Sequence, residues 1–570
     1  MKKLINDANN VVQEMVAGLT LTYGGLQRLP GENVILRFDA AVVRETGVAV
    51  ISGGGSGHEP AHAGYVGAGM LSAAVLGEVF TSPSTDAVLA AIHAVSGPAG
   101  TLLIIKNYTG DRLNFQLAAE IARAEGYEVE TAVVGDDVSL PYSEDHAGRR
   151  GLAGTVLVHK VAGAAAGAGL PLVEVAEVAR STAARVATMG VALGPCTIPA
   201  AGVPNFAIAD TEMELGLGIH GEAGVERCRV EPVDRLVERI LERILQDASH
   251  RPRERAVLMV NNLGGTTIME LAIVARRAIE LLELRHMVVE RVYVGTFLSA
   301  LEMPGVSISL LGEVDDRTLA FLDARTSAPA WPNAAAMSRT PALSTISTLR
   351  PKLKRDSTSE ISWREAGPSI SEGIRRAASA LIAAETRLTQ LDRQVGDGDM
   401  GISLQRGART VLAALDELQQ ESPAATFRAL GLMVRRVVAG TSGSLYAAFL
   451  LRAAASLDGS LPADLVRWAD ALDAGIAGIA EFGGAAQGDR TMLDALIPAA
   501  AALREQLVAE RPLRDALLAA AAAGRSGADA TAAMTARRGR SSYLGTRVIG
   551  VRDPGAEAVA IWLDAVAKCP

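Results

Sequence analysis

The first half of the 570-residue chain repeats one local pattern, and this pattern constrains the fold more than any other feature. A short run of β-branched and other apolar residues ends in a polar or glycine-rich loop, and a helical stretch follows. Repeated strand–loop–helix units indicate an α/β fold, in which the loops after the strands carry the ligand site. We therefore predict an α/β N-terminal domain of two subdomains, with its chemistry in these loops. The clearest runs with their loops are 48–52 before 53–60, 101–105 before 106–111, and 256–260 before 261–267.

The second half has a different texture. It is rich in Ala, Leu and Arg, and few of its runs could be strands. Four segments keep the apolar spacing of helices, namely 370–388, 424–438, 445–455 and 463–480. The stretch between the halves is rich in Pro and Ser, as interdomain linkers are. We predict an α/β domain at 1–330, a linker at 331–365 and an all-helical bundle or barrel at 366–570.

The overall charge and the cysteines limit the class of protein. A net charge of −9 argues against nucleic acid or an anionic membrane surface as partner, but not against nucleotides, because a phosphate site is a local arrangement. No uncharged apolar stretch is long enough to cross a bilayer, and the N-terminus has no signal-peptide pattern. The three cysteines lie far apart without a CxxC pair. We expect a reduced, cytoplasmic protein.

The glycine-rich loop 53–57 leads directly into His58. Successive glycines let backbone N–H groups approach a ligand oxygen, although a tight strand-to-helix turn has the same composition. His58 and His62 also match the HExxH pattern of zinc proteases. That chemistry needs both histidines on one face of a helix and a third ligand, and the preceding glycines and Pro60 disfavour such a helix. A zinc hydrolase is the alternative for this segment.

Two further loops of the first half carry reactive side chains. The loop 106–111 places the cation Lys106 and the carboxylate Asp111 at a strand end, although Asp111 could simply cap a helix over 112–125. The segment 216–222 ends an apolar run in His220 between glycines, and a lone histidine there could be purely structural.

Taken in order, GGGSGHEP, KNYTGDRLNF and MELGLGIHGE resemble the substrate-binding half of dihydroxyacetone kinases, over about residues 1–330. The resemblance implies that His220 forms a covalent hemiaminal with the ketone carbon of a short ketose. It implies that Asp111 is the base towards the terminal hydroxyl and that His58 assists by hydrogen bonding. Backbone groups near Gly55 and the side chain of Lys106 complete the implied pocket.

An acidic loop opens the second domain. Asp392, Asp397 and Asp399 lie close together in a glycine-containing segment, so they repel one another unless a cation neutralises them. The EF-hand template lacks its closing Glu here, and Mg²⁺ fits better, whereas a solvated turn is the structural alternative. Further on, 440–445 opens a helix with hydroxyls and N–H groups that either bind phosphate or form an ordinary cap.

With the loops 488–494 and 539–556, this set resembles the nucleotide-binding domain of ATP-dependent dihydroxyacetone kinases, from about Gly367 onward. The resemblance implies that the three aspartates chelate two Mg²⁺ ions that bridge the phosphates of ATP. The other implied nucleotide contacts are Thr441, Ser442 and Gly443, with Arg540 and Asp553 at the rim. Met400 stands where some relatives carry His, which weakens any histidine-assisted step in this domain.

We therefore predict ATP-dependent phosphorylation of the terminal hydroxyl of a short ketose, with dihydroxyacetone as the first candidate. Both halves on one chain favour direct use of ATP over a phosphocarrier protein, and the resemblance favours a homodimer. The alternatives are a four-carbon ketose (erythrulose) kinase, an FMN cyclase side activity and a non-catalytic ketose-binding regulator. The regulator predicts a broken aspartate triplet, and here the triplet is whole.

Overall fold

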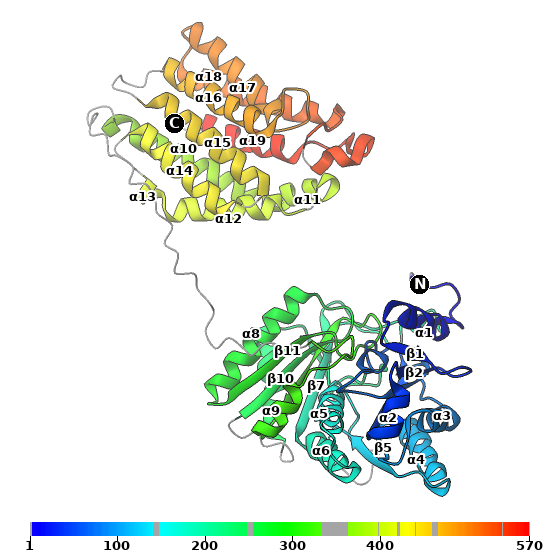
Figure 1. Ribbon diagram of the computed structural model, residues 1–570. Helices are drawn as coiled ribbons and strands as arrows, with labels where there is room; N and C mark the ends of the chain where they lie inside the picture. The colour runs from blue at the N-terminus through cyan, green and yellow to red at the C-terminus, as the bar shows by residue number, and fades with distance from the viewer. Residues whose placement is uncertain are drawn as a thin grey trace. The chain divides into compact units, whose positions relative to one another are not determined.

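The computed structural model describes residues 3–140, 148–247, 255–332, 363–396, 398–418, 422–438, 440–458, 465–538 and 540–568. The chain divides into two compact units, Met1–Ile346 and Ser347–Pro570 (Figure 1). Most of the predicted linker, 333–362, lies outside the described residues. Its ends differ from the prediction, because Trp331 is buried in the core of the first unit and a helix of the second unit begins at Trp363.

The first unit contains two six-stranded sheets, as the prediction of two α/β subdomains requires. The first sheet has the order β1-β2-β4-β3-β5-β6, and its neighbours β4-β3-β5-β6 are parallel, whereas the β1–β2 and β2–β4 pairs are antiparallel. Its strands are β1 (Leu26–Arg28), β2 (Val34–Arg37), β3 (Ala49–Ser56), β4 (Ala73–Val79), β5 (Thr101–Lys106) and β6 (Val129–Val134).

The second sheet has the order β11-β10-β12-β7-β8-β9 and is antiparallel except for the β10–β11 pair. Its strands are β7 (Val186–Ala192), β8 (Glu212–Leu215), β9 (Glu226–Arg229), β10 (Arg255–Asn262), β11 (Val288–Gly295) and β12 (Gly305–Leu311). Helices α7 (Val233–Gln246) and α8 (Ile268–Leu284) cover its outer face.

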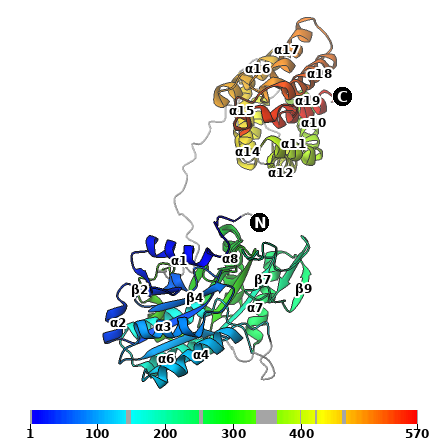
Figure 2. The same cartoon turned by 90° about the vertical axis from the view of Figure 1, so that its right-hand side faces the viewer.

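One apolar core joins the two sheets. Helices α1 (Val11–Thr22), α5 (Thr155–Gly167), α6 (Leu172–Arg185) and α9 (Asp316–Asp323) pack with strands of both sheets in a single buried cluster. The other face of the first sheet is covered by α2 (Ala40–Thr46), α3 (Thr85–Val95) and α4 (Thr109–Ala124), as Figure 2 shows. The loops at the ends of β3 and β5 therefore have a rigid base.

The second unit is helical throughout its described residues, which confirms the predicted class. Its helices are α10 (Trp363–Ala383), α11 (Glu385–Val395), α12 (Met400–Ala413), α13 (Leu415–Leu418), α14 (Pro423–Val437), α15 (Gly440–Leu457), α16 (Leu465–Gly483), α17 (Leu493–Val508), α18 (Leu513–Ala530) and α19 (Pro554–Ala567), with 3-10 turns η2 (Thr531–Ala533) and η3 (Arg540–Val548). The predicted single helix over 370–388 is wrong, because the chain breaks between α10 and α11 at Ala384.

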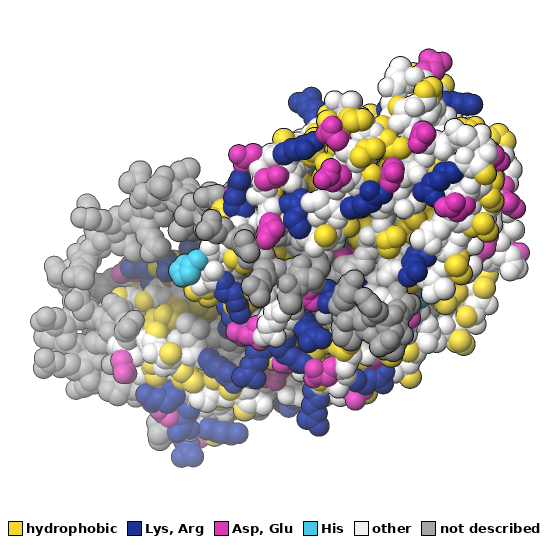
Figure 3. All heavy atoms as spheres, turned by 90° about the horizontal axis from the view of Figure 1, so that it is seen from below, with side chains coloured by type: hydrophobic (Ala, Val, Ile, Leu, Met, Phe, Trp, Pro, Cys, Tyr) yellow, Lys and Arg dark blue, Asp and Glu magenta, His cyan; other side chains and the backbone are white. Residues whose placement is uncertain are grey.

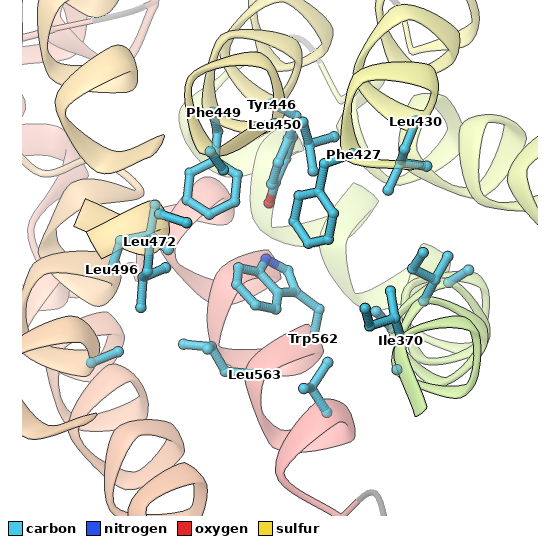
Figure 4. Close-up of a pocket in the computed structure, with 18 of the residues that line it drawn as sticks. Ile370, Phe427, Leu430, Tyr446, Phe449, Leu450, Leu472, Leu496, Trp562 and Leu563 are labelled. Atoms are coloured by element: carbon cyan, nitrogen blue, oxygen red, sulfur yellow. The ribbon is translucent and has the colours of Figure 1, made fainter. Parts of the chain in front are cut away.

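The large helices close into a ring. Successive contacts run α10–α12–α14–α15–α16–α17–α18–α19, and α19 returns to α10. The ring encloses an apolar cavity of about 850 Å³, and Figure 4 shows Phe427, Phe449 and Trp562 from three different helices pointing towards it. The small residues that dominate this half allow the helices to approach closely.

Basic and acidic side chains are interspersed on the face that Figure 3 shows. Among the described helices, none combines the length with the apolar character that crossing a membrane requires.

Candidate active site

Close backbone packing explains the glycines at the end of β3. A Cβ on Gly55 would lie 2.6 Å from the backbone N of Thr81, and one on Gly54 would lie 2.8 Å from Lys106 Nζ. Since real Cβ atoms do not approach so closely, only glycine lets these neighbours reach the strand end. Strands β3 and β5 are parallel neighbours, so the side chains of the loop after β5 meet the glycine loop.

Two imidazoles face each other above this glycine loop. His58 Nε2 lies 3.0 Å from His220 Nε2, although the residues are 162 positions apart. His58 Nδ1 lies 2.7 Å from the carbonyl oxygen of Ser299, and His220 Nδ1 lies 2.8 Å from Glu222 Oε1. Burial lowers the pKa of His58 well below its usual range, and the charges of Lys106 and His220 act in the same direction. The structure thus brings together two histidines that the sequence singled out.

Aromatic rings hold the pair in place. The ring of Phe80 stacks on the ring of His58, with ring centroids 5.0 Å apart. Phe80 also forms a T-shaped contact with His220, again with centroids 5.0 Å apart. Tyr108 meets His220 edge-on at 4.9 Å. Phe80 has a φ of 57°, a backbone conformation that is uncommon for a bulky side chain. Such strain is found mostly where the surrounding structure needs a side chain at one exact place, here against two imidazoles.

Lys106 and Asp111 lie together beside Gly54 and are both almost completely buried. Asp111 Oδ1 has no hydrogen-bond partner among the described residues, so it is available to accept a hydrogen bond from a ligand. Asp111 lies in the first turn of α4, where the helix dipole favours a negative charge. The cap position belongs to Tyr108, so the alternative of Asp111 as a mere helix cap is wrong. Burial lowers the pKa of Lys106, and the charge of Asp111 opposes that shift.

The zinc-protease alternative fails on geometry. The residues from His58 to His62 form a loop between β3 and the short 3-10 turn Ala63–Tyr65, not a helix, so the two histidines do not share a helical face. His58 faces His220, whereas His62 is buried edge-on against His159, with ring centroids 5.1 Å apart. The HExxH match therefore lies in a loop whose two histidines face different parts of the structure.

In the helical unit, the side chain of Asp392 holds the two ends of the acidic loop together by hydrogen bonds. It lies in the last turn of α11, is buried, and its Oδ2 accepts hydrogen bonds from the backbone N–H of Asp399 at 3.0 Å and of Met400 at 3.1 Å. Asp399 is exposed at the start of α12. Asp397 lies outside the described residues, within which no three His, Cys, Asp or Glu side chains cluster as a metal site. An exposed carboxylate beside a structurally anchored one suits a hard cation with oxygen ligands.

Other nucleotide-loop candidates lie at the helix starts of the same unit. Thr441, Ser442 and Gly443 occupy the first turn of α15, with Thr441 exposed and Gly443 buried against Val438. Arg540 begins η3. Leu544 and Val548 of η3 pack against Val395, so this turn lies beside the end of α11 that carries Asp392.

Asp553 caps α19, with Oδ1 accepting from the backbone N–H of Ala556 at 2.8 Å. Burial raises the pKa of Asp553 to about 6, an effect that Arg490 opposes. The fully buried Arg490 donates to the carbonyl of Val551 at 2.8 Å, and its Nη1 lies 3.8 Å from Asp553 Oδ2. Gly555 lies near both Met400 and Met492, so the starts of α12, α17 and α19 meet at one end of the ring.

Sequence reasoning missed several residues of these sites. Ser299 and Phe80 come from segments far from the quoted motifs, and no local signal marks them. Glu222 and Tyr108 lie inside the quoted motifs but had no assigned role. Arg490 gave a signal that could have been used, because an arginine within a glycine- and aspartate-rich loop often pairs with a nearby carboxylate.

Comparison with known proteins covers both units. The Dak1 domain model matches residues 17–330, and the DAK2 domain model matches residues 394–568. A putative 3,4-dihydroxy-2-butanone kinase of Solanum lycopersicum is 47% identical, and the match covers 99% of this chain and 98% of that protein. The triokinase/FMN cyclase of Homo sapiens is 44% identical, again over 99% of this chain and 98% of that protein.

A solved structure shows the same architecture. The dihydroxyacetone kinase of C. freundii in its native form is 34% identical, covers 100% of both chains and has a TM-score of 0.63. The same enzyme was also crystallised in complex with AMP-PNP and Mg²⁺, and that structure matches with a TM-score of 0.62. With both domain models in order on one chain and relatives of this identity over nearly its full length, the protein belongs to the dihydroxyacetone kinase family of ATP-dependent phosphotransferases, in its fused two-domain form.

Proposed function

We propose that this protein transfers the γ-phosphoryl group of ATP to the terminal hydroxyl of a short ketose, with dihydroxyacetone as the first candidate. The observation that carries the proposal is the pair His58 and His220, whose Nε2 atoms lie 3.0 Å apart. The charge of the buried Lys106 acts on His58, and Asp111 beside Lys106 keeps its Oδ1 without a partner among the described residues. Its relatives named dihydroxyacetone kinase and triokinase, one of them complexed with AMP-PNP and Mg²⁺, support the same chemistry.

In this proposal, His220 holds the ketose covalently. Its Nε2 lone pair forms a bond to the ketone carbon, the π pair of the carbonyl moves to oxygen, and that oxygen takes a proton to give a hemiaminal. His58 is placed to deliver this proton, because its Nε2 lies 3.0 Å from the attacking nitrogen. Since only an electrophilic carbon reacts in this way, the pocket selects ketoses over polyols.

Asp111 is the proposed base for the transfer step. Its free Oδ1 accepts the proton of the terminal hydroxyl as that oxygen attacks the γ-phosphorus of ATP. Lys106 lies beside it, since both side chains approach the position of a Cβ on Gly54. Lys106 and the backbone near Gly55 orient the remaining oxygens of the ketose.

The helical unit is the proposed ATP site. Asp392, Asp397 and Asp399 would hold two Mg²⁺ ions, which neutralise charge on the transferring phosphoryl group when bound. Thr441, Ser442 and Gly443 offer the hydroxyls and N–H groups of a helix start to the phosphates. Arg540 and Asp553 complete the rim. A homodimer in the cytoplasm is part of the same proposal.

Two alternatives have specific support. The tomato relative is named for a four-carbon substrate, which favours a tetrulose such as erythrulose as the second candidate ketose. The human relative's name includes FMN cyclase, so a side activity on FAD with Mn²⁺ in place of Mg²⁺ is the second candidate reaction. A non-catalytic ketose-binding regulator is disfavoured by the intact aspartate triplet.

The test is ADP release measured over a panel of trioses and tetruloses, with FAD and Mn²⁺ as a separate arm. His220→Ala and Asp399→Ala should each abolish ketose-dependent turnover. Matched controls are His93→Ala and Asp470→Ala, which remove exposed residues that form surface ion pairs with Glu125 and Arg504. Unchanged turnover in both site variants would refute the proposed mechanism.

A further inference from the structure

The side chain of Glu222 contacts His220 twice. Its Oε1 lies 2.8 Å from His220 Nδ1, and its Oε2 accepts a hydrogen bond from the backbone N–H of the same histidine. The turn between them is closed by the backbone N–H of Gly218, which donates to the carbonyl of Glu222 at 3.1 Å. One carboxylate therefore orients both the ring and the main chain of the residue proposed to bind the ketose.

The turn is built to seat this carboxylate. A Cβ on Gly218 would lie 2.0 Å from Glu222 Oε2 and 2.6 Å from Arg150 Nη1, so any larger residue would displace both groups. Arg150 in turn donates to the carbonyl of Gly216 at 2.6 Å and to Asp137 at 2.7 Å. The side chain of Glu222 is 40% exposed, but its two contacts with His220 and the close approach at Gly218 fix its position.

Counting hydrogens gives the tautomer. A carboxylate only accepts, so His220 Nδ1 must carry the hydrogen and its Nε2 keeps a lone pair. A backbone carbonyl also only accepts, so His58 Nδ1 carries a hydrogen towards Ser299. At 3.0 Å the two Nε2 atoms are close enough to share one added proton, which stays on His58 when Nε2 of His220 attacks the ketone.

We propose that Glu222 is a positioning residue that fixes His220 in the Nδ1–H tautomer, so that Nε2 is the atom that bonds the ketone carbon. This inference rests on the proposed function. In the addition, the Nε2–C bond forms, the carbonyl π pair moves to oxygen, and the oxygen takes the proton shared with His58. The alkylated ring of His220 is then cationic, and its Nδ1–H still donates to the negative charge of Glu222.

The charge of Glu222 is present under all physiological conditions. Burial alone would raise its pKa, but the hydrogen bond and charge of His220 lower the pKa of Glu222 to about 2. A permanently ionised acceptor beside Nδ1 favours the cationic ring of the adduct over the free imidazole.

Glu222→Gln tests the inference at nearly constant size. If the amide NH₂ of the new glutamine faces Nδ1, the ring hydrogen must move to Nε2, which then has no lone pair to attack the ketone. If the amide oxygen faces Nδ1 instead, the NH₂ faces the backbone N–H of His220, and two donors repel each other. We expect kcat/KM for the ketose to fall by about 10²-fold or more. The mass of the covalent adduct on the intact protein should also be lost, and ¹⁵N NMR of labelled histidine should show a changed tautomer.

Two further variants make the result decisive. Glu222→Asp keeps the charge and should recover part of the adduct, whereas Glu226→Gln, an exposed carboxylate of β9 paired with Arg239, should behave as wild type. Wild-type tautomer and adduct in a folded Glu222→Gln protein would overturn the inference, as would equal losses in the Gln and Asp variants. Failure of the proposed function looks different, because the wild type itself would then release no ketose-dependent ADP.

Discussion

The two halves organise their reactive groups in opposite ways. In the α/β unit, His58, His220, Ser299 and Glu222 are tied to one another by hydrogen bonds, and His58 and Ser299 are buried. In the helical unit, Asp399 is exposed at a helix start. The first site is thus formed by the protein alone, because strand ends and a shared core support it. The second has groups that a cation and phosphates would organise, so variants of the two halves should separate binding of the ketose from transfer.

Asp111→Asn should separate ketose binding from phosphoryl transfer most strongly. Loss of the proposed base should lower kcat by about 10²- to 10⁴-fold, because the hydroxyl proton then has no acceptor. The ketose adduct on His220 should persist, since Asp111 takes no part in forming it. ADP release measures the first effect and intact-protein mass measures the second. Loss of the adduct together with turnover would show that Asp111 serves the pocket's architecture instead.

A smaller effect, confined to the other half, is expected from Asp399→Asn. Removing one exposed carboxylate would weaken the proposed cation site, so the Mg²⁺ concentration for half-maximal turnover should rise by about 10- to 100-fold. Adduct formation in the absence of ATP should be unchanged. A titration of turnover with Mg²⁺ checks this, with Asp470→Asn as the exposed control. An unchanged Mg²⁺ requirement would argue that the acidic loop is only a solvated turn.

The stability of Gly55→Ala measures how tightly the glycine loop is packed. Gly55→Ala should destabilise the protein by about 1–3 kcal/mol, because the new methyl meets the backbone of Phe80 and Thr81, which cannot rotate away. Gly18→Ala in α1, with nothing within 4 Å, should be neutral or stabilising by about 0.5–1 kcal/mol. Chemical denaturation of both variants checks this. Equal stabilities would mean that the glycine loop is looser than its packing indicates.

The same contrast explains what the sequence could predict. His58, Asp111 and His220 could be singled out because each lies in a local motif, and the strand–loop–helix repeat was enough to predict the α/β class. The partners of these residues were not found, because Ser299 is 241 residues from His58 and only the fold brings them together. The break between α10 and α11 was missed because Ala384, a strong helix former, gives no stop signal. Trp331 was assigned to the linker because nearby prolines hid its burial in the core.

The smallest expected effect concerns pH and compares one buried aspartate in each half. Burial raises the pKa of Asp553 to about 6, and likewise that of Asp136 to about 6. A carboxyl whose pKa is higher in the folded than in the unfolded protein binds its proton more tightly when folded. The stability it contributes is therefore complete below about pH 4 and is lost as the pH rises to about 6.

Each group should account for at most about 2–3 kcal/mol of that loss. Asp553→Asn and Asp136→Asn should each flatten the fall in the free energy of unfolding between pH 4 and 6, measured by urea denaturation. The two effects should be of similar size, because both pKa values are raised to about 6, although Arg490 opposes the shift of Asp553 and Asp137 adds to that of Asp136. A much larger flattening for one of the two variants would mean that burial raises the pKa of that aspartate further than the pKa of the other.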